Sequence, residues 1–205
     1  LRPTPKLARP SQTRREAWGF LHEKAFWLLA GLLFFETASE TGATGWLVSY
    51  YKGSGILSGV ASQYSLTVIW GVMLLTRLFI VFVMKPVENR RLLLFISLRC
   101  IASYAVLLFM TTPVSSMLAL VVFSVFVAGA NPTAVAGAGN RLTPQGMSVL
   151  LPIGALGSIL MPTIIGIVVD SAGLQMGMGT ILITLVGMLV FAVLFRRSSK
   201  ALEDA

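Results

Sequence analysis

The sequence predicts an all-α membrane protein with six transmembrane helices, and two observations lead to this fold class. Hydrophobic residues make up 56% of the 205-residue chain and charged residues 12%, with a mean hydropathy of +0.83. A chain this apolar cannot cover its surface with polar groups as a soluble globule does. Its apolar runs are about twenty residues long, which matches a hydrocarbon core of roughly 30 Å. They are continuous rather than alternating, so helices are expected and barrel strands are not.

Turn-forming residues divide the apolar sequence into six spans. Pro, Gly and Ser cluster between the spans, as at Lys52-Gly53-Ser54-Gly55 and Thr143-Pro144-Gln145-Gly146. The connections are short, so successive helices are expected to run antiparallel. The predicted spans are residues 24–51, 57–84, 92–110, 116–138, 147–169 and 176–195.

The basic residues predict the orientation of these spans. If the N-terminus is inside, thirteen of the sixteen Lys and Arg residues fall on the cytoplasmic face and only Lys52 falls on the opposite face. Arg77 and Arg99 lie within spans. This asymmetry follows the positive-inside rule, so both termini are expected in the cytoplasm and the protein in the plasma or inner membrane. The basic residues that give the net charge of +8 are therefore expected to contact anionic lipid and not nucleic acid.

The terminal segments are expected to lie outside the bilayer. Residues 1–23 are interpreted as a basic cytoplasmic linker in which SQTRREAWGFLHEK forms either an interfacial helix or a disordered segment. Residues 197–205 are expected to form a cytoplasmic tail. Cys100 is the only cysteine, which excludes a disulfide framework or a thiolate metal site, and no metal or cofactor is expected.

Two glutamates interrupt the first span. At about 100° per residue, Glu36 and Glu40 lie some 40° apart, on a stripe that Ala43, Leu47 and Tyr50 extend. Counted from Trp27, they lie roughly 13 and 19 Å into the membrane, on either side of its midplane. The opposite face carries a strip of small residues that allows a neighbouring helix to approach closely. This strip comprises Ala38, Gly42, Gly45 and Ser49.

A charged group at the centre of a spanning helix costs about 2.5 to 3.5 kcal/mol on insertion scales, so these glutamates are not expected to face lipid. One interpretation is that they line a water-accessible pathway, where at least one binds a proton or a polar substrate. The alternative is structural: they form hydrogen bonds to neighbouring helices or pair with Arg77. Arg77 lies roughly 12 Å deep in the second span, at a height from which it could reach Glu36.

The second span carries a mixed stripe suited to a cavity wall. Gln and Thr offer hydrogen bonds, and Trp offers a flat surface on which a sugar ring can stack. The alternative is ordinary packing with an interhelical polar contact, which is favoured for Thr67 and Leu74. The stripe consists of Gln63, Thr67, Trp70, Leu74 and Arg77.

Proline and small residues mark the fourth and fifth spans. Asn131 is expected either to contact substrate or to cap the carbonyl groups freed by Pro132, which removes a backbone donor and kinks the helix. Pro152 and Pro162 lie in a glycine-rich fifth span that can bend. Movement is one consequence, although Pro and Gly are also common in membrane helices for packing alone.

These motifs resemble the C-terminal half of major facilitator superfamily transporters. ETGATGWLVSYY is similar to the helix that opens that half, and is closest to the fucose:proton symporter-like group and related sugar transporters. LLTRLFIVFVMKPVENRRLLLF resembles the superfamily's Gly-Arg-Phe helix and basic loop, except that Thr76 replaces the glycine and Leu78 separates Arg77 from Phe79. GANPTAVAGAGNR and LPIGALGSILMPTIIGIVVDSAG resemble the fourth and fifth helices of the same half.

The resemblance covers residues 24–196 and implies a six-helix half built from two inverted three-helix repeats, working by alternating access. It matches Glu40 and Trp46 to the family's motif residues, whereas Glu36 is outside the motif. Members have twelve helices, so the chain is expected to be a fragment of a longer protein or one subunit of a split transporter. Its partner would be an N-terminal six-helix half.

The expected function is proton-coupled transport of a sugar or similar small polar solute. The first alternative is a drug or metabolite exporter of the same superfamily, because Leu74 and Trp70 are apolar. A six-helix channel or a membrane scaffold is a further alternative. An enzyme is not expected, because an intramembrane serine protease needs a Ser-His dyad and no histidine lies in any span.

Overall fold

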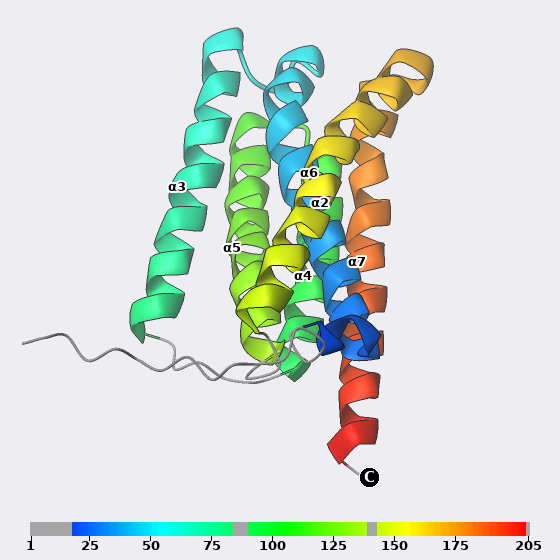
Figure 1. Cartoon of the computed structure of the whole chain (residues 1–205). Coiled ribbons are helices and arrows are strands. Elements are labelled where there is room, and N and C mark those ends of the chain that lie inside the picture. Colours follow the sequence, from blue (N-terminus) through cyan, green and yellow to red (C-terminus); the bar gives the residue numbers. More distant parts are fainter. Residues whose placement is uncertain (1–17, 84–89, 139–142, 204–205) are drawn as a thin grey trace, which may run out of the picture.

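The computed structural model describes residues 18–83, 90–138 and 143–203, and these form a bundle of six α-helices preceded by one helical turn (Figure 1). Residues 11–17 of the possible interfacial helix lie outside the described residues; the part that follows includes the short 3-10 turn η1(Gly19–His22). The helices are α2(Lys24–Gly53), α3(Gly59–Val83), α4(Arg90–Phe109), α5(Pro113–Ala138), α6(Pro144–Ala172) and α7(Leu174–Glu203).

Each predicted span corresponds to one helix, and the helix ends show why the boundaries differ. Pro113 precedes the predicted fourth span and Pro144 lies in a predicted turn, yet they begin α5 and α6, because proline is well tolerated in the first turn of a helix. Thr143 caps α6 by accepting a hydrogen bond from the Gly146 backbone N–H at 3.0 Å. The hydropathy of the sequence ends the sixth span at Phe195. In the structure α7 continues through the polar residues that follow, as far as Glu203.

Five of the six helices, α3 to α7, are long and apolar enough to cross a membrane, so the chain is a helical membrane protein. The exception is α2, which carries both glutamates and many small polar residues. It is 30 residues long and 15 of its residues are buried. A helix surrounded by other helices does not need an apolar surface on every side, so its position in the bundle accounts for its composition.

The helices run alternately up and down, and α2 occupies the middle of the bundle (Figure 1). It packs most extensively against α6 and α7 and less extensively against α3 and α5. α4 packs between α5 and α7, whereas α3 and α6 make no extensive contact with each other. The beginning of α2 and the end of α7 lie at the same end of the bundle, as the six-span prediction requires (Figure 1).

The small-residue strip of α2 makes the close contacts that were predicted. A Cβ atom on Gly42 would lie 2.9 Å from the Met161 side chain of α6. On α6, a Cβ atom on Gly157 would overlap the backbone carbonyl of Phe34. The hydroxyl of Thr37 donates a hydrogen bond to the Gly154 carbonyl at 2.5 Å. These contacts bring the backbones of α2 and α6 together, as small residues do in membrane helix pairs.

Candidate functional site

Glu36 lies in the interior of the bundle, on the side of α2 away from the Gly42 strip. It is 0% exposed, and its Oε2 accepts a hydrogen bond from the Nδ2 of Asn131 in α5 at 3.1 Å. Its Oε1 is also buried, but it accepts no hydrogen bond from any residue that the structure describes. Cys100 of α4 is fully buried and near enough to interact electrostatically with this carboxyl group. A buried polar oxygen without a partner is costly, and such groups often mark functional sites.

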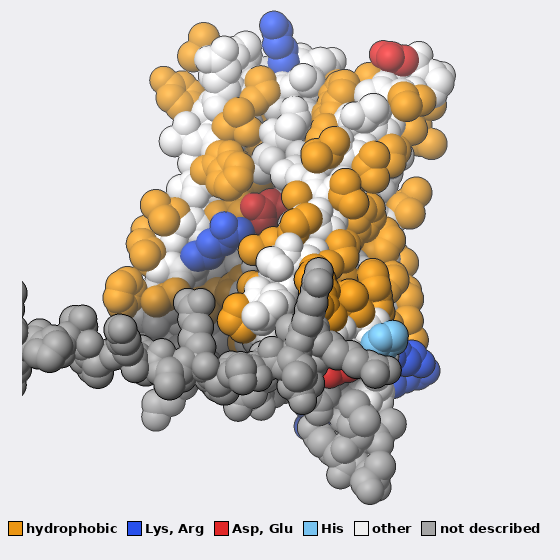
Figure 2. Space-filling view, viewed as in Figure 1, with side chains coloured by type: hydrophobic (Ala, Val, Ile, Leu, Met, Phe, Trp, Pro, Cys, Tyr) orange, Lys and Arg blue, Asp and Glu red, His pale blue; other side chains and the backbone are white. Residues whose placement is uncertain are grey.

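Glu40 lies one helical turn after Glu36 and forms an ion pair with Arg77 of α3. The Arg77 Nη2 and the Glu40 Oε2 are 3.0 Å apart. The Glu40 side chain is 13% exposed and that of Arg77 is 41% exposed, so this pair opens onto the surface of the bundle. Figure 2 shows an acidic and a basic group together, midway along a largely hydrophobic face between α3 and α6.

The two carboxyl groups lie one helical turn apart on α2 and are near enough to interact electrostatically. Asn131 and Arg77 each donate to a different one of the two glutamates. Two ionised carboxyl groups and one guanidinium leave a net negative charge, and one added proton makes the group neutral. We call Glu36, Glu40, Asn131 and Arg77 the carboxyl cluster.

The partner of Arg77 is Glu40 and not Glu36, which the depth estimate had matched to it. The difference comes from side-chain direction. Helical side chains point toward the N-terminus of their own helix. Because α3 runs antiparallel to α2, the Arg77 side chain therefore extends deeper into the membrane than its own Cα, toward Glu40. Asn131, for which substrate contact and capping were the alternatives, donates a hydrogen bond to Glu36, and its contact with a substrate stays a prediction.

The rest of the mixed stripe of α3 lies on the outside of this six-helix bundle. Gln63, Thr67, Trp70 and Leu74 are all exposed, Trp70 by 48% and Leu74 by 59%. None of the four makes a hydrogen bond to another residue in the described part of the chain. They belong to the same helix face as Arg77, so the stripe leads along the surface to the carboxyl cluster.

The other predicted residues divide between packing and exposed positions. Trp46 donates its indole N–H to the Pro162 carbonyl of α6 at 3.0 Å, which joins α2 to α6. Gly45 faces the Pro162 ring more loosely, at 3.9 Å from the position of a Cβ atom. Pro132 follows Asn131 inside α5, and Pro152 is exposed on α6. The carboxyl cluster is thus separate from the contacts of Trp46.

The carboxyl cluster contains two acidic side chains, Glu36 and Glu40. Among residues 18–83, 90–138 and 143–203, no three His, Cys, Asp or Glu side chains gather as metal ligands would. No model of a known protein family matches the sequence, and comparison with curated proteins also finds no match.

Proposed function

We propose that this protein is one six-helix half of a secondary transporter and that the carboxyl cluster binds the coupling proton. The observation that carries this proposal is the environment of Glu36. Its carboxyl group is fully buried, has one oxygen without a partner in the described structure, and adjoins a second carboxyl group. A proton shared by the two glutamates would supply the missing hydrogen bond and neutralise the cluster.

The proton would exchange through Glu40, because its ion pair with Arg77 reaches the surface between α3 and α6. Protonation of Glu40 removes the charge that holds Arg77. A change of this kind couples proton binding to the position of α3 relative to α2. The sequence resemblance to major facilitator superfamily transporters supports alternating access as the wider mechanism.

The solute we propose is a sugar or similar small polar molecule, bound beside Trp70, Gln63 and Thr67 on the exposed face of α3. Stacking on an indole ring with hydrogen bonds from neighbouring amide and hydroxyl groups is a suitable chemistry for a sugar ring. The face exposes polar and aromatic groups whose side chains make no hydrogen bond to any residue that the structure describes. A second six-helix half, from the same longer chain or another subunit, would cover this face and complete the site.

A drug or metabolite exporter is the second candidate. The exposed Leu74 and Trp70 favour it, because they would bind an apolar solute better than a sugar. The plasma or inner membrane with both termini in the cytoplasm remains the proposed location, from the distribution of basic residues.

The test is uptake of radiolabelled fucose, galactose and glucose into membrane vesicles from cells that make the protein from its native gene. A pH gradient should drive uptake of one of them. Glu40→Gln should abolish gradient-driven uptake and spare exchange of the same sugar across the membrane without a gradient. Asp170→Asn, which changes an exposed acidic residue at the end of α6, is the matched control and should leave both unchanged. Gradient-driven uptake that survives Glu40→Gln would contradict the proposed role of the cluster.

A further inference from the structure

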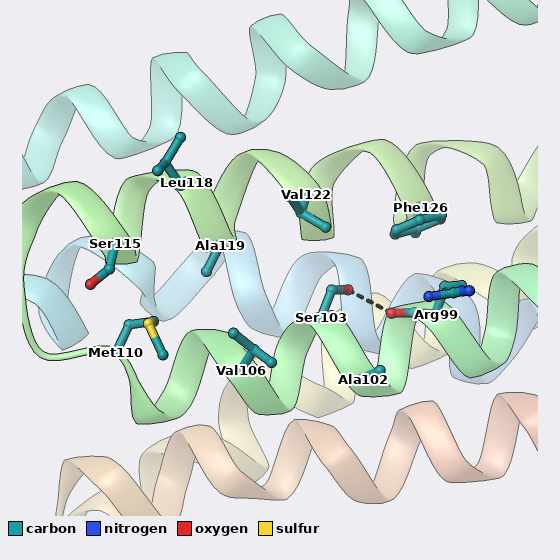
Figure 3. Close-up of a pocket in the computed structure, with 10 residues that line it drawn as sticks. All are labelled: Arg99, Ala102, Ser103, Val106, Met110, Ser115, Leu118, Ala119, Val122 and Phe126. Carbon is teal, nitrogen blue, oxygen red and sulfur yellow. Dashed lines mark hydrogen bonds between the residues drawn. The ribbon is translucent and has the colours of Figure 1, made fainter.

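A groove of about 410 Å³ runs between α4 and α5 on the outer surface of the bundle (Figure 3). Arg99 lies at one end and Met110 and Ser115 lie at the other (Figure 3). Between them the groove is lined mainly by small and aliphatic side chains, including Ala102, Val106, Ala119 and Val122. It is separate from the carboxyl cluster, because Cys100 is the α4 residue that lies near Glu36, and Arg99 projects about 100° away from it.

Arg99 is the one charged group in this groove, and it is exposed. Its guanidinium carbon lies 4.9 Å from the centre of the Phe95 ring, which in turn contacts Phe126 edge to face at 6.4 Å. Within the described residues, the Arg99 guanidinium makes no hydrogen bond and no ion pair. A cation that faces hydrocarbon is costly, and an anion beside it would lower that cost. The contact with Phe95 holds the guanidinium on one side of α4.

The direction of the Arg99 side chain places this anion toward one leaflet. Phe95 lies one helical turn closer than Arg99 to the start of α4, where Arg90 and Arg91 are found. The guanidinium is therefore directed toward the headgroups at that end of the helix. From Arg99 the groove runs the other way, about 16 Å along α4 to Met110, so an acyl chain whose headgroup lies near Arg99 would extend along it away from that end of the helix.

The remaining polar group near Arg99 is already satisfied. The Ser103 hydroxyl donates to the backbone carbonyl of Arg99 at 2.7 Å, as drawn in Figure 3. The middle of the groove therefore offers an apolar surface with no group that seeks a hydrogen bond. An acyl chain suits such a surface, and basic pockets between transmembrane helices are known to hold anionic lipid headgroups.

We propose that this groove binds one anionic phospholipid, with its phosphate against Arg99 and one acyl chain along the surface between α4 and α5. A net negative headgroup is favoured because Arg99 has no counter-ion in the described structure. A zwitterionic headgroup brings a cation of its own, which reduces the attraction. This site is independent of the transport function proposed above.

The experiment is native mass spectrometry of the full chain in detergent micelles, with added palmitoyl-oleoyl phosphatidylglycerol or phosphatidylcholine. The wild-type chain should retain phosphatidylglycerol in preference to phosphatidylcholine. Arg99→Gln should weaken phosphatidylglycerol binding by about tenfold or more, because it removes a charge-assisted contact. Arg197→Gln, at an exposed position near the end of α7, is the matched control for loss of one positive charge and should bind as wild type does.

A second pair of variants tests the groove itself. Val122 and Val186 are both 48% exposed, but only Val122 lines the groove. Val122→Trp should fill the groove and reduce lipid retention, whereas Val186→Trp should not. Equal retention of the two lipids by the wild-type chain, or unchanged binding by Arg99→Gln and Val122→Trp, would overturn the proposal. Retention of oleate in place of phosphatidylglycerol would also overturn it, because the anion would then be a free carboxylate.

Discussion

The two sides of α2 contact their neighbouring helices in different ways. Toward α6 and α7, small residues bring helix backbones together, so that Gly157 of α6 has no room for even a methyl group beside Phe34. Toward α3 and α5, the contacts are fewer and polar, through Glu36, Glu40 and their partners. One helix thus has a tightly packed side and a side held by hydrogen bonds and charge.

This difference indicates where movement and chemistry can occur. Close-packed backbones have discrete, well-defined arrangements, and altering them costs much free energy. The contacts on the other side are one ion pair and one amide hydrogen bond. Binding of a proton or a solute can replace them. The packed side therefore serves as a rigid support for the carboxyl cluster on the other side.

Gly157→Leu should destabilise the protein most, by more than about 3 kcal/mol, because the obstacle is the backbone of α2 and cannot rotate aside. The measurement is the free energy of unfolding by denaturing detergent. Gly179→Leu on α7 is the matched control, since a Cβ atom there meets nothing within 4 Å. Equal losses in the two variants would show that the α2 and α6 contact is not a rigid support.

Asn131→Leu should cost about 1 to 3 kcal/mol, because it keeps the side-chain size but leaves Glu36 buried without its amide donor. Ser124→Ala is the control on the same face of α5. Among the described residues, the Ser124 hydroxyl bonds only the Leu120 carbonyl of its own helix, at 2.6 Å. Unfolding in detergent should separate the two variants, and an unperturbed Asn131→Leu protein would argue against the bond to Glu36.

A double-mutant cycle should identify the partner of Arg77. Coupling between Arg77→Gln and Glu40→Gln should be about 1 kcal/mol, and larger than coupling between Arg77→Gln and Glu36→Gln. The first pair is in direct contact and the second interacts only through space. If the order were reversed, the depth-matched pairing of Arg77 with Glu36 would be correct.

Trp46→Phe should have the smallest effect, about 1 kcal/mol, since it removes the indole donor to the Pro162 carbonyl and keeps an aromatic ring. Trp70→Phe is the matched control, because the Trp70 indole has no hydrogen bond within the described structure and is half exposed. The two variants should therefore differ in unfolding free energy. If they lose the same amount, the bond from Trp46 contributes nothing to the packed side.

Residue spacing predicted the composition of each side of α2 but not which groups would pair. Helical periodicity placed Glu36 and Glu40 on one face and Gly42 on the other, because it depends only on the backbone. The partner of Arg77 depends on the direction of a long side chain relative to an antiparallel helix, which a depth estimate leaves out. The contact between Asn131 and Glu36 joins residues 95 positions apart, so no local pattern signals it.

The exposed positions were the hardest to interpret from sequence. Gln63, Thr67 and Trp70 share a face, and periodicity found that face, yet it could not tell whether the face was turned inward or outward. For Arg99, the sequence predicted only that it lies within a span. The groove beside it is formed by side chains from two helices, and only their packing in three dimensions reveals it.

In the proposed mechanism, Glu36 and Glu40 act as one proton-binding site. Infrared difference spectroscopy of the purified chain, taken between acidic and alkaline pH, measures the carbonyl band of a protonated carboxyl group directly. If the two glutamates share a proton, the wild-type spectrum contains a band that both Glu36→Gln and Glu40→Gln remove or shift, while Asp170→Asn leaves it unchanged. Two separate bands, each removed by only one of the glutamine variants, would contradict a shared site.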